Sequence, residues 1–252
     1  MSMVERFESI TLSRKRVHHI LQNFKKSSQQ LGDDRNAIRI VEDKGKKLVV
    51  KSFKIPNAVN KLAYRFLRDS KAKRSYENAV YLQQHNIGTP APLAYLERVD
   101  TLSFKDSYYI SEYAEHDYTY RELINDNTIE NKEEVLKAFT AFMFKMHEAH
   151  IYFLDHSPGN TLIKKVGDSY EFFLVDLNRM KFYDIPYEDR LKNFERLSPK
   201  KWMYDIMGAE YARLSGKDPA ESIATMWSYT QKFQEKYHRK KRFKKKLKSI
   251  FS

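Results

Sequence analysis

Three oxygen-bearing side chains are spaced between residues 146 and 180 as phosphoryl transfer would require. The segment reads MHEAHIYFLDHSPGNTLIKKVGDSYEFFLVDLNRM, and Asp155, Asn160 and Asp176 occur in it in that order. Gly167-Asp168 predicts a two-residue hairpin turn. If the two strands pair outward from this turn, Asn160 lies opposite Val175, the residue before Asp176. An amide oxygen and a carboxylate about 5 Å apart suit Mg²⁺, which typically takes one or two protein ligands besides waters and phosphate oxygens.

Asp155 lies five residues before Asn160 on the same loop and has neither Lys nor Arg as an immediate neighbour. We expect it to accept the proton of a hydroxyl group as that hydroxyl attacks a phosphorus atom. The catalytic apparatus of phosphoryl transfer has this order: an Asp, four intervening residues, an Asn, a hairpin and a second Asp. The alternative for each residue alone is structural, because Asp and Asn favour turns around Pro158-Gly159 and Asp176 could cap a strand end.

The upstream half supplies a lysine and a glutamate of the kind this chemistry needs. Lys51 ends the β-prone run Leu48-Val49-Val50-Lys51 and is expected to hold the α- and β-phosphates of a nucleotide. Glu77 lies on a predicted helix and is expected to orient Lys51 through an ion pair. The chain order Lys51, Glu77, Asp155, Asn160, Asp176 is that of a protein-kinase-like fold.

Two further stretches are expected to contact the nucleotide. The loop 30–36 contains one glycine, and its Gly32 and Asn36 would lie over the phosphates, which backbone amides can bind. The strand that ends near Glu112 would lie against the adenine ring, with Glu112 and Ala114 offering backbone groups to its edge. The alternative is an ordinary amphipathic strand.

The elements around these residues predict an α+β protein with two lobes. A small antiparallel β lobe with one main helix is expected at 1–113, a helical catalytic lobe at 114–238 and a separate basic tail at 239–252. Apolar periodicity and turn residues predict strands at 38–42, 47–53, 93–97 and 108–113, two β-prone runs within 161–175, and helices at 13–30, 70–86, 133–150, 198–216 and from 218 onward. Ser198-Pro199 and Asp218-Pro219 are read as helix starts.

The basic tail holds eight Lys/Arg and no acid, and without it the net charge falls from +13 to +5. Phe243, Leu247, Ile250 and Phe251 follow one another at steps of four, three and one, which on a helix form a stripe flanked by lysines. This pattern is typical of a helix on an anionic membrane, where each basic residue contributes about 1 kcal/mol. A solvated tail and non-specific nucleic-acid contact are the alternatives.

Composition excludes several classes of protein and site. The chain has no cysteine, which excludes disulfides, thiolate chemistry and iron–sulfur clusters, while 41% hydrophobic residues suffice for a packed core. No apolar run is long enough to span a membrane, and no secretory signal is found at the N-terminus, so a cytoplasmic, peripheral protein is expected. We interpret His147 and His150 as packed or solvated rather than metal-binding, and expect His156 to reach acceptor or phosphate.

Residues 49–97 together with 146–180 resemble the Kdo/heptose lipopolysaccharide kinase family. The helix start Ser70-Lys71-Ala72-Lys73-Arg74-Ser75 and the turn Thr89-Pro90-Ala91-Pro92 carry the resemblance. It implies a kinase-like two-lobed fold, ATP and Mg²⁺ as cofactors, and a lipid-linked sugar of the lipopolysaccharide inner core as acceptor, met at the inner face of a membrane.

Carried over by position, the family assigns the nucleotide phosphates to Lys51 and Glu77, the base to Asp155 and magnesium to Asn160 and Asp176. The chain departs from the kinase pattern at three places: it has no Gly-x-Gly-x-x-Gly loop, Phe153-Leu154 precedes the aspartate, and Asp176-Leu177-Asn178 replaces Asp-Phe-Gly.

The alternatives to a lipopolysaccharide kinase come from three classes. An aminoglycoside- or choline-type kinase shares the spacing of Asp155 and Asn160, but cationic acceptors call for an acidic pocket and this chain is basic. A catalytically inactive, kinase-like membrane-binding module would account for the missing glycine loop. A basic nucleic-acid binder would show steep salt dependence that survives loss of Asp155.

Overall fold

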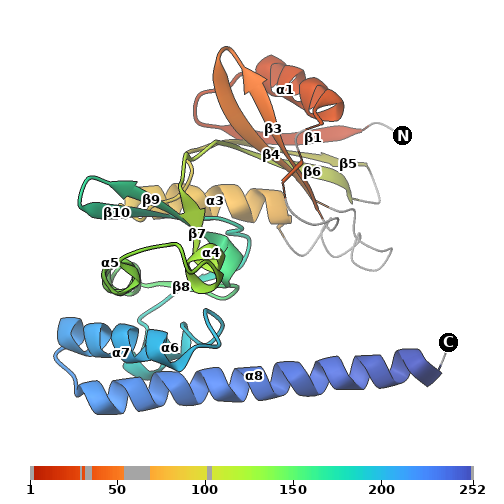
Figure 1. The fold of residues 1–252 in the computed structure, drawn as a ribbon. Coiled ribbons are helices and arrows are strands. Elements are labelled where there is room, and N and C mark those ends of the chain that lie inside the picture. The colour runs from red at the N-terminus through yellow and green to blue at the C-terminus, as the bar shows by residue number, and fades with distance from the viewer. Residues whose placement is uncertain (1–2, 29, 32–35, 54–68, 101–103, 251–252) are drawn as a thin grey trace. The chain divides into compact units, whose positions relative to one another are not determined.

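The computed structural model describes residues 3–28, 30–31, 36–53, 69–100 and 104–250 (Figure 1). The chain divides into two compact units. The first unit comprises Met1–Glu115 and Phe173–Arg179, and the second comprises His116–Phe172 and Met180–Ser252. The N-terminal part of the first unit ends at Glu115, two residues after the lobe boundary expected from the sequence. The segment 173–179, which the sequence analysis placed in the C-terminal lobe, belongs to the first unit.

The first unit is built on a six-stranded antiparallel sheet whose strands follow the order β1-β5-β6-β4-β3-β2. Its strands are β1 (Val4–Ser9), β2 (Gln30–Leu31), β3 (Asn36–Asp43), β4 (Lys46–Phe53), β5 (Pro92–Val99) and β6 (Phe104–Glu112). The sequence analysis did not predict β1, which pairs with β5 at one edge of the sheet. The predicted hairpin at 38–53 is confirmed, because β3 and β4 meet at Lys44 and Gly45, whose positive φ angles of 51° and 74° are those of a two-residue turn.

Two helices cover the two faces of this sheet. Alternate residues of a strand point to opposite faces, and in β4 the side chains of Leu48 and Val50 join the core under α1 (Arg14–Lys26), whereas Phe53 joins the core under α3 (Lys71–Gln84). Both helices begin at a serine whose side chain accepts a hydrogen bond from the first turn. Lys51 is two residues from Phe53 and therefore lies on the α3 face.

The second unit combines two small sheets with helices. Phe139 lies at its centre, with ring centroids 4.6 Å from Tyr120, 5.6 Å from Phe172 and 6.5 Å from Phe194. The strands are β7 (Tyr118–Thr119), β8 (Ile151–Phe153), β9 (Thr161–Val166), β10 (Ser169–Leu174) and β11 (Met180–Phe182), and the helices are α4 (Tyr120–Asn125), α5 (Lys132–Glu148), α6 (Tyr187–Lys192), α7 (Lys201–Ser215) and α8 (Pro219–Ile250), with a 3₁₀ turn η1 at Pro158–Asn160.

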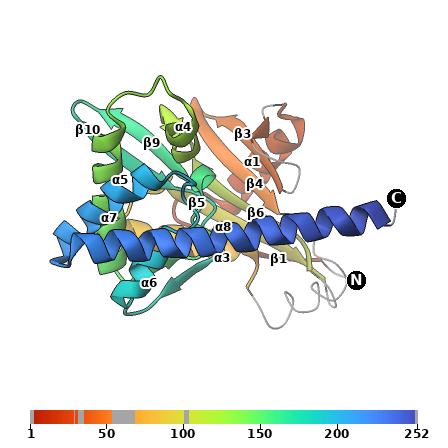
Figure 2. The ribbon, with the colours of Figure 1, turned by 60° about the horizontal axis from the view of Figure 1, so that its bottom comes forward.

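Helices α7 and α8 lie side by side and are joined by a tight turn at Gly216 (Figures 1 and 2). Gly208 allows their close approach, because a Cβ atom there would lie 2.9 Å from the Cα of Ile223. The predicted start of α7 at Pro199 is wrong: the helix begins at Lys201, because the Ser198 hydroxyl accepts from the Lys200 N–H and holds the residues before it in a turn.

The predicted tail is part of α8 rather than a separate segment. No Gly or Pro interrupts the chain after Pro219, and most residues there favour a helix, so α8 continues for 32 residues to Ile250. Asp218 caps it as expected, accepting a hydrogen bond from the Glu221 N–H. In the part of the chain that the structure describes, no helix combines the length and the apolar character needed to span a membrane.

Candidate active site

Lys51 and Asp176 form an ion pair within the first unit. The Lys51 ammonium group donates a hydrogen bond to Oδ1 of Asp176 and also lies 5.2 Å from the ring centroid of Phe53. Lys51 is 8% exposed, so its charge is nearly buried and needs an anionic partner. The structure thus unites two of the residues selected from the sequence, at positions 125 apart in the chain.

Asp176 is held in an uncommon backbone conformation by its surroundings. Its φ angle is +62°, which a residue with a side chain adopts rarely and which costs free energy unless neighbours enforce it. The amide of Asn178 donates to Asp176 Oδ1 at 2.8 Å, and Asn78 of α3 donates to the carbonyl oxygen of Leu177 at 2.6 Å. Upstream, the Thr89 hydroxyl bonds to the Leu174 carbonyl at 2.9 Å. Strained aspartate geometry fixed in this way is typical of functional sites.

The expected ion pair between Glu77 and Lys51 is absent from the part of the chain that the structure describes. Glu77 is exposed and pairs with Lys73, one helical turn earlier, at 3.5 Å. The physical reason is helix phase: Glu77 lies about 100° beyond the buried Tyr76, on the side of α3 away from the sheet. Its neighbour Asn78 is the α3 residue that contacts the Asp176 segment.

Asp155 and Asn160 come together in the second unit, in the loop between β8 and β9. The Asn160 side-chain nitrogen donates to the backbone carbonyl of Asp155 at 2.8 Å, which closes the loop around η1. Arg196 was not selected from the sequence: its Nη1 contacts Oδ1 of Asp155 at 3.0 Å and the carbonyl oxygen of Leu154 at 3.2 Å. The loop therefore presents a carboxylate and an amide oxygen whose positions are fixed by hydrogen bonds.

A second arginine lies against this loop. A Cβ atom built on Gly159 would lie 2.8 Å from a terminal nitrogen of Arg121, the first α4 residue after Tyr120. The absence of a side chain at Gly159 is what admits the guanidinium group. Arg121 therefore lies against the loop at Gly159 and Arg196 contacts it at Asp155, so two cations flank a loop that could face an anionic ligand such as phosphate.

Buried hydrogen bonds fix strand β8, which leads into Asp155. His147 at the end of α5 bonds through Nδ1 to the Tyr211 hydroxyl at 2.8 Å and through Nε2 to Asn193 Oδ1 at 3.1 Å. Asn193 in turn donates to the Phe153 carbonyl at 2.8 Å. Burial lowers the pKa of His147 to about 4, so this histidine is neutral near pH 7.

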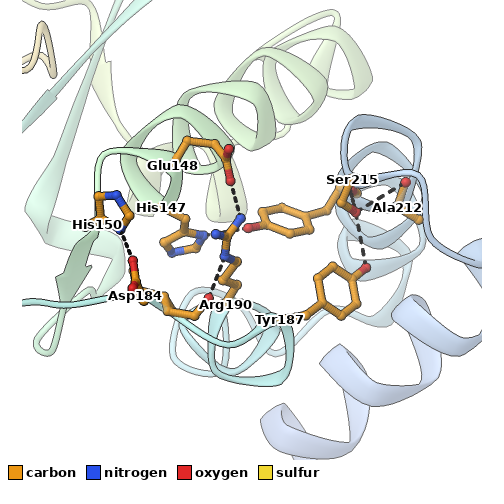
Figure 3. A network of polar contacts seen from close by, with 10 residues as sticks. His147, Glu148, His150, Asp184, Tyr187, Arg190, Ala212 and Ser215 are labelled. Atoms are coloured by element: carbon orange, nitrogen blue, oxygen red, sulfur yellow. Dashed lines mark hydrogen bonds and ion pairs between the residues drawn. The ribbon is translucent and has the colours of Figure 1, made fainter.

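Ion pairs surround the same network. Arg190 bonds to the Glu148 carboxylate and, at 2.9 Å, to the carbonyl oxygen of Ile185. His150 contacts Asp184 at 2.8 Å (Figure 3). His147 is buried and the His150 side chain is 56% exposed, which is compatible with the interpretation of these histidines as packed or solvated.

His156 does not reach the surface, contrary to expectation. It is 1% exposed, and its Nε2 is 2.9 Å from the Thr161 hydroxyl, while its ring stacks on Phe153 at a centroid distance of 5.2 Å. Burial lowers its pKa to about 3. In this position it supports the loop from inside and cannot bind an acceptor.

The other residues expected to contact the nucleotide, over its phosphates or at its base, are only partly described. Gly32 lies outside the described residues, and Asn36 is the first residue of β3, paired with Phe53. The N–H of Glu112 donates to the Ala91 carbonyl at 2.9 Å, so it is already used within the unit. A nucleotide contact at Glu112 or Ala114 would then rely on other backbone groups.

Asn160 in the second unit and Asp176 in the first each carry a side-chain oxygen of a kind that Mg²⁺ binds. Because Asn160 uses its side-chain nitrogen on Asp155, its amide oxygen is the atom left to act as a ligand. Oxygen ligands of this kind, with phosphate oxygens, are those that Mg²⁺ prefers. Among the described residues no group of three or more His, Cys, Asp or Glu side chains is placed to hold a metal ion.

Comparison with known proteins places this chain among lipopolysaccharide kinases. The model of the lipopolysaccharide kinase (Kdo/WaaP) family matches residues 34–217. A solved structure described as WaaP in complex with acyl carrier protein matches with a TM-score of 0.59 and 15% sequence identity, over 94% of this chain and 99% of that chain. This likeness confirms the expected α+β, protein-kinase-like fold. No curated protein matches the chain by sequence.

Proposed function

Because the chain belongs to the lipopolysaccharide kinase (Kdo/WaaP) family and is therefore a phosphotransferase, we propose that it transfers the γ-phosphoryl group of ATP to a sugar hydroxyl of the lipopolysaccharide inner core. The observation that carries this proposal is the extent of the family match, which runs from residue 34 to residue 217 and so includes Lys51, Asp155, Asn160 and Asp176.

In this proposal the first unit binds the phosphates of ATP. The buried Lys51 ammonium group, now balanced by Asp176, has the charge needed to hold the α- and β-phosphate oxygens. A fixed cation is effective there because phosphoryl transfer depends on positioning and charge neutralisation more than on covalent chemistry. Glu77 is not proposed as its partner, since Glu77 pairs with Lys73.

Asp155 is proposed as the base. The acceptor hydroxyl gives its proton to the Asp155 carboxylate while its oxygen forms a bond to the γ-phosphorus, and the bond between that phosphorus and the bridging oxygen of ADP breaks. The fixed loop supports this role, because Asn160 and Arg196 both bind Asp155 and hold it in one orientation.

Asn160 and Asp176 are proposed to hold Mg²⁺ through their side-chain oxygens. Magnesium bound there would neutralise charge on the phosphate oxygens. The hydrogen bond from Asn178 orients the Asp176 carboxylate, and the bond from Asn160 to the Asp155 carbonyl orients the Asn160 amide.

The second half of α8 is proposed to bind an anionic membrane on the cytoplasmic side, where a lipid-linked acceptor would be met. All residues from Glu235 to Phe243 are exposed, including four consecutive basic residues at 239–242, and Phe243 is 63% exposed. An open hollow of about 810 Å³ lies along the same helix between Trp227 and Arg242. Basic residues beside an exposed aromatic ring favour a negatively charged lipid surface.

Vesicle co-sedimentation tests the membrane proposal on the full chain. Reversing Lys240, Lys241 and Arg242 to Glu should weaken binding to anionic vesicles at least about 100-fold, since each basic residue contributes about 1 kcal/mol. The matched control reverses the exposed lysines Lys15, Lys25 and Lys26 of α1 and should bind as the wild type does. Equal binding of both variants would contradict the proposal, and binding to purified acyl carrier protein instead of vesicles would favour a protein partner like that of WaaP.

The enzymatic proposal is tested with a panel of acceptors. Purified protein is incubated with γ-labelled ATP and Mg²⁺ and either lipid A carrying its inner-core sugars, an aminoglycoside, choline or no acceptor. We expect label only in the lipid. Label in the aminoglycoside or in choline would show that the acceptor is a cationic small molecule and not the lipid. If no acceptor is labelled and ATP·Mg²⁺ does not raise the melting temperature of the protein, an inactive kinase-like module is favoured.

A further inference from the structure

Arg196 joins the catalytic loop to helix α8. One guanidinium nitrogen, Nη1, contacts both the Leu154 carbonyl at 3.2 Å and the Asp155 carboxylate at 3.0 Å. The side chains of Arg196 and Asp155 are 34% and 26% exposed, so the pair is half-buried and partly shielded from water. Such a contact restrains the carboxylate together with the backbone that carries it.

Arg196 is in turn held by α8. Its guanidinium carbon lies 5.6 Å from the ring centroid of Phe233, a distance at which a cation is attracted to the face of an aromatic ring. At the next residue of α8, the Gln234 amide reaches the Ser198 carbonyl at 3.5 Å. Two neighbouring residues of α8 therefore contact the segment that carries Arg196.

We propose that Arg196 is a positioning residue for Asp155 and that Phe233 of α8 keeps Arg196 in the position this requires. The inference rests on the proposed role of Asp155 as base. Arg196 holds one carboxylate oxygen and so fixes the direction of the other, which decides whether the acceptor hydroxyl can transfer its proton. Such orientation matters because a loose phosphoryl-transfer transition state depends on the positioning of the reacting groups more than on covalent chemistry.

The proposal predicts a graded response to substitution. Arg196→Met removes the contact to Asp155 and should lower kcat by about 10- to 100-fold, because small misplacements of reacting groups cost about that much. Arg196→Lys keeps a cation and should recover a substantial part of kcat. Phe233→Leu keeps apolar bulk but removes the ring and should lower kcat by about 3- to 10-fold, whereas Phe233→Tyr should not.

The experiment measures kcat and the KM for ATP with γ-labelled ATP and lipid A carrying inner-core sugars. Arg213→Met, at an exposed arginine of α7 paired with Glu210, is the matched control. We expect the KM for ATP to stay within about twofold in every variant, since Arg196 acts on the acceptor proton and not on the nucleotide. A purely structural role would instead lower kcat equally in Arg196→Met and Arg196→Lys, in step with their melting temperatures, and would overturn the proposal.

The outcomes distinguish a failure of the proposed role of Arg196 from a failure of the proposed role of Asp155 as base. Full activity of Asp155→Ala would overturn the proposed base, and with it this inference. Inactive Asp155→Ala together with fully active Arg196→Met would overturn only the role of Arg196. Should Arg196→Met fail to fold, Arg196→Lys and the contrast between Phe233→Leu and Phe233→Tyr decide the question, since an equal kcat in the two Phe233 variants would also contradict the proposal.

Discussion

Lowering the pH should destabilise the protein through His147, whose hydrogen bonds fix the strand that leads into the catalytic loop. Burial lowers the pKa of His147 from 6.5 to about 4. Between these two pH values His147 is protonated in the unfolded chain but neutral in the folded protein. The free energy of unfolding therefore falls as the pH falls from 6.5 toward 4. A difference of about 2.5 pKa units corresponds to a loss of about 3 kcal/mol, a large part of the stability of an ordinary domain.

Urea denaturation at several pH values between 7 and 4 measures this loss. His147→Gln can still form hydrogen bonds but does not titrate, so its stability should decline less steeply with falling pH than that of the wild type, by about 3 kcal/mol over the whole range. The absolute stability of the variant at pH 7 is not the test, since the two hydrogen bonds change as well.

His150→Gln is the matched control, because His150 lies three residues away and its side chain is 56% exposed. Its stability is measured over the same pH range, so that the loss of a buried histidine is compared with the loss of an exposed one. Parallel curves for His147→Gln and the wild type would refute the assignment of His147 as a buried neutral histidine.

The remaining predictions concern packing and the Asp176 segment. Gly208→Ala should lower the free energy of unfolding by about 1–2 kcal/mol, as measured by urea denaturation. Overpacking against the Ile223 backbone outweighs the better helix propensity of alanine. A variant as stable as the wild type would contradict the close packing of α7 and α8. Asn78→Ala removes the hydrogen bond to the Leu177 carbonyl and should reduce thermal stabilisation by ATP·Mg²⁺. Asn125→Ala, which removes a comparable bond at an exposed residue of α4, should leave that stabilisation unchanged.

The predictable parts of the site are those encoded by local spacing. The turn at Gly167-Asp168 is where β9 ends and β10 begins, as expected from two residues that favour a hairpin turn. The alternation of side chains along β4 was sufficient to place Lys51 on the opposite face of the sheet from Leu48 and Val50, which lie under α1. Helix phase also contained the information that Glu77 faces away from the sheet, since the buried residues of α3 define its opposite side.

Other features depend on packing between distant parts of the chain. Arg196 is 41 residues from Asp155 and reaches it because the turns after α6 bring it there, which no spacing rule expresses. Strand β1 escaped prediction because it is an edge strand whose side chains are at most half-buried, and it pairs with β5, which is far away in sequence. The Asp176 segment joins the first unit through hydrogen bonds to Asn78 and Thr89, and no spacing rule predicts these two contacts.

The most direct test of the account is the rate of transfer of labelled phosphate from ATP to lipid A carrying its inner-core sugars, in the wild type and in Asp155→Asn. The account predicts transfer by the wild type and a rate about 10²- to 10⁴-fold lower in the variant, with unchanged thermal stabilisation by ATP·Mg²⁺. Transfer at the wild-type rate by Asp155→Asn would contradict the role of this residue as base. A wild-type protein that binds ATP·Mg²⁺ and leaves the lipid unlabelled would contradict the proposed acceptor.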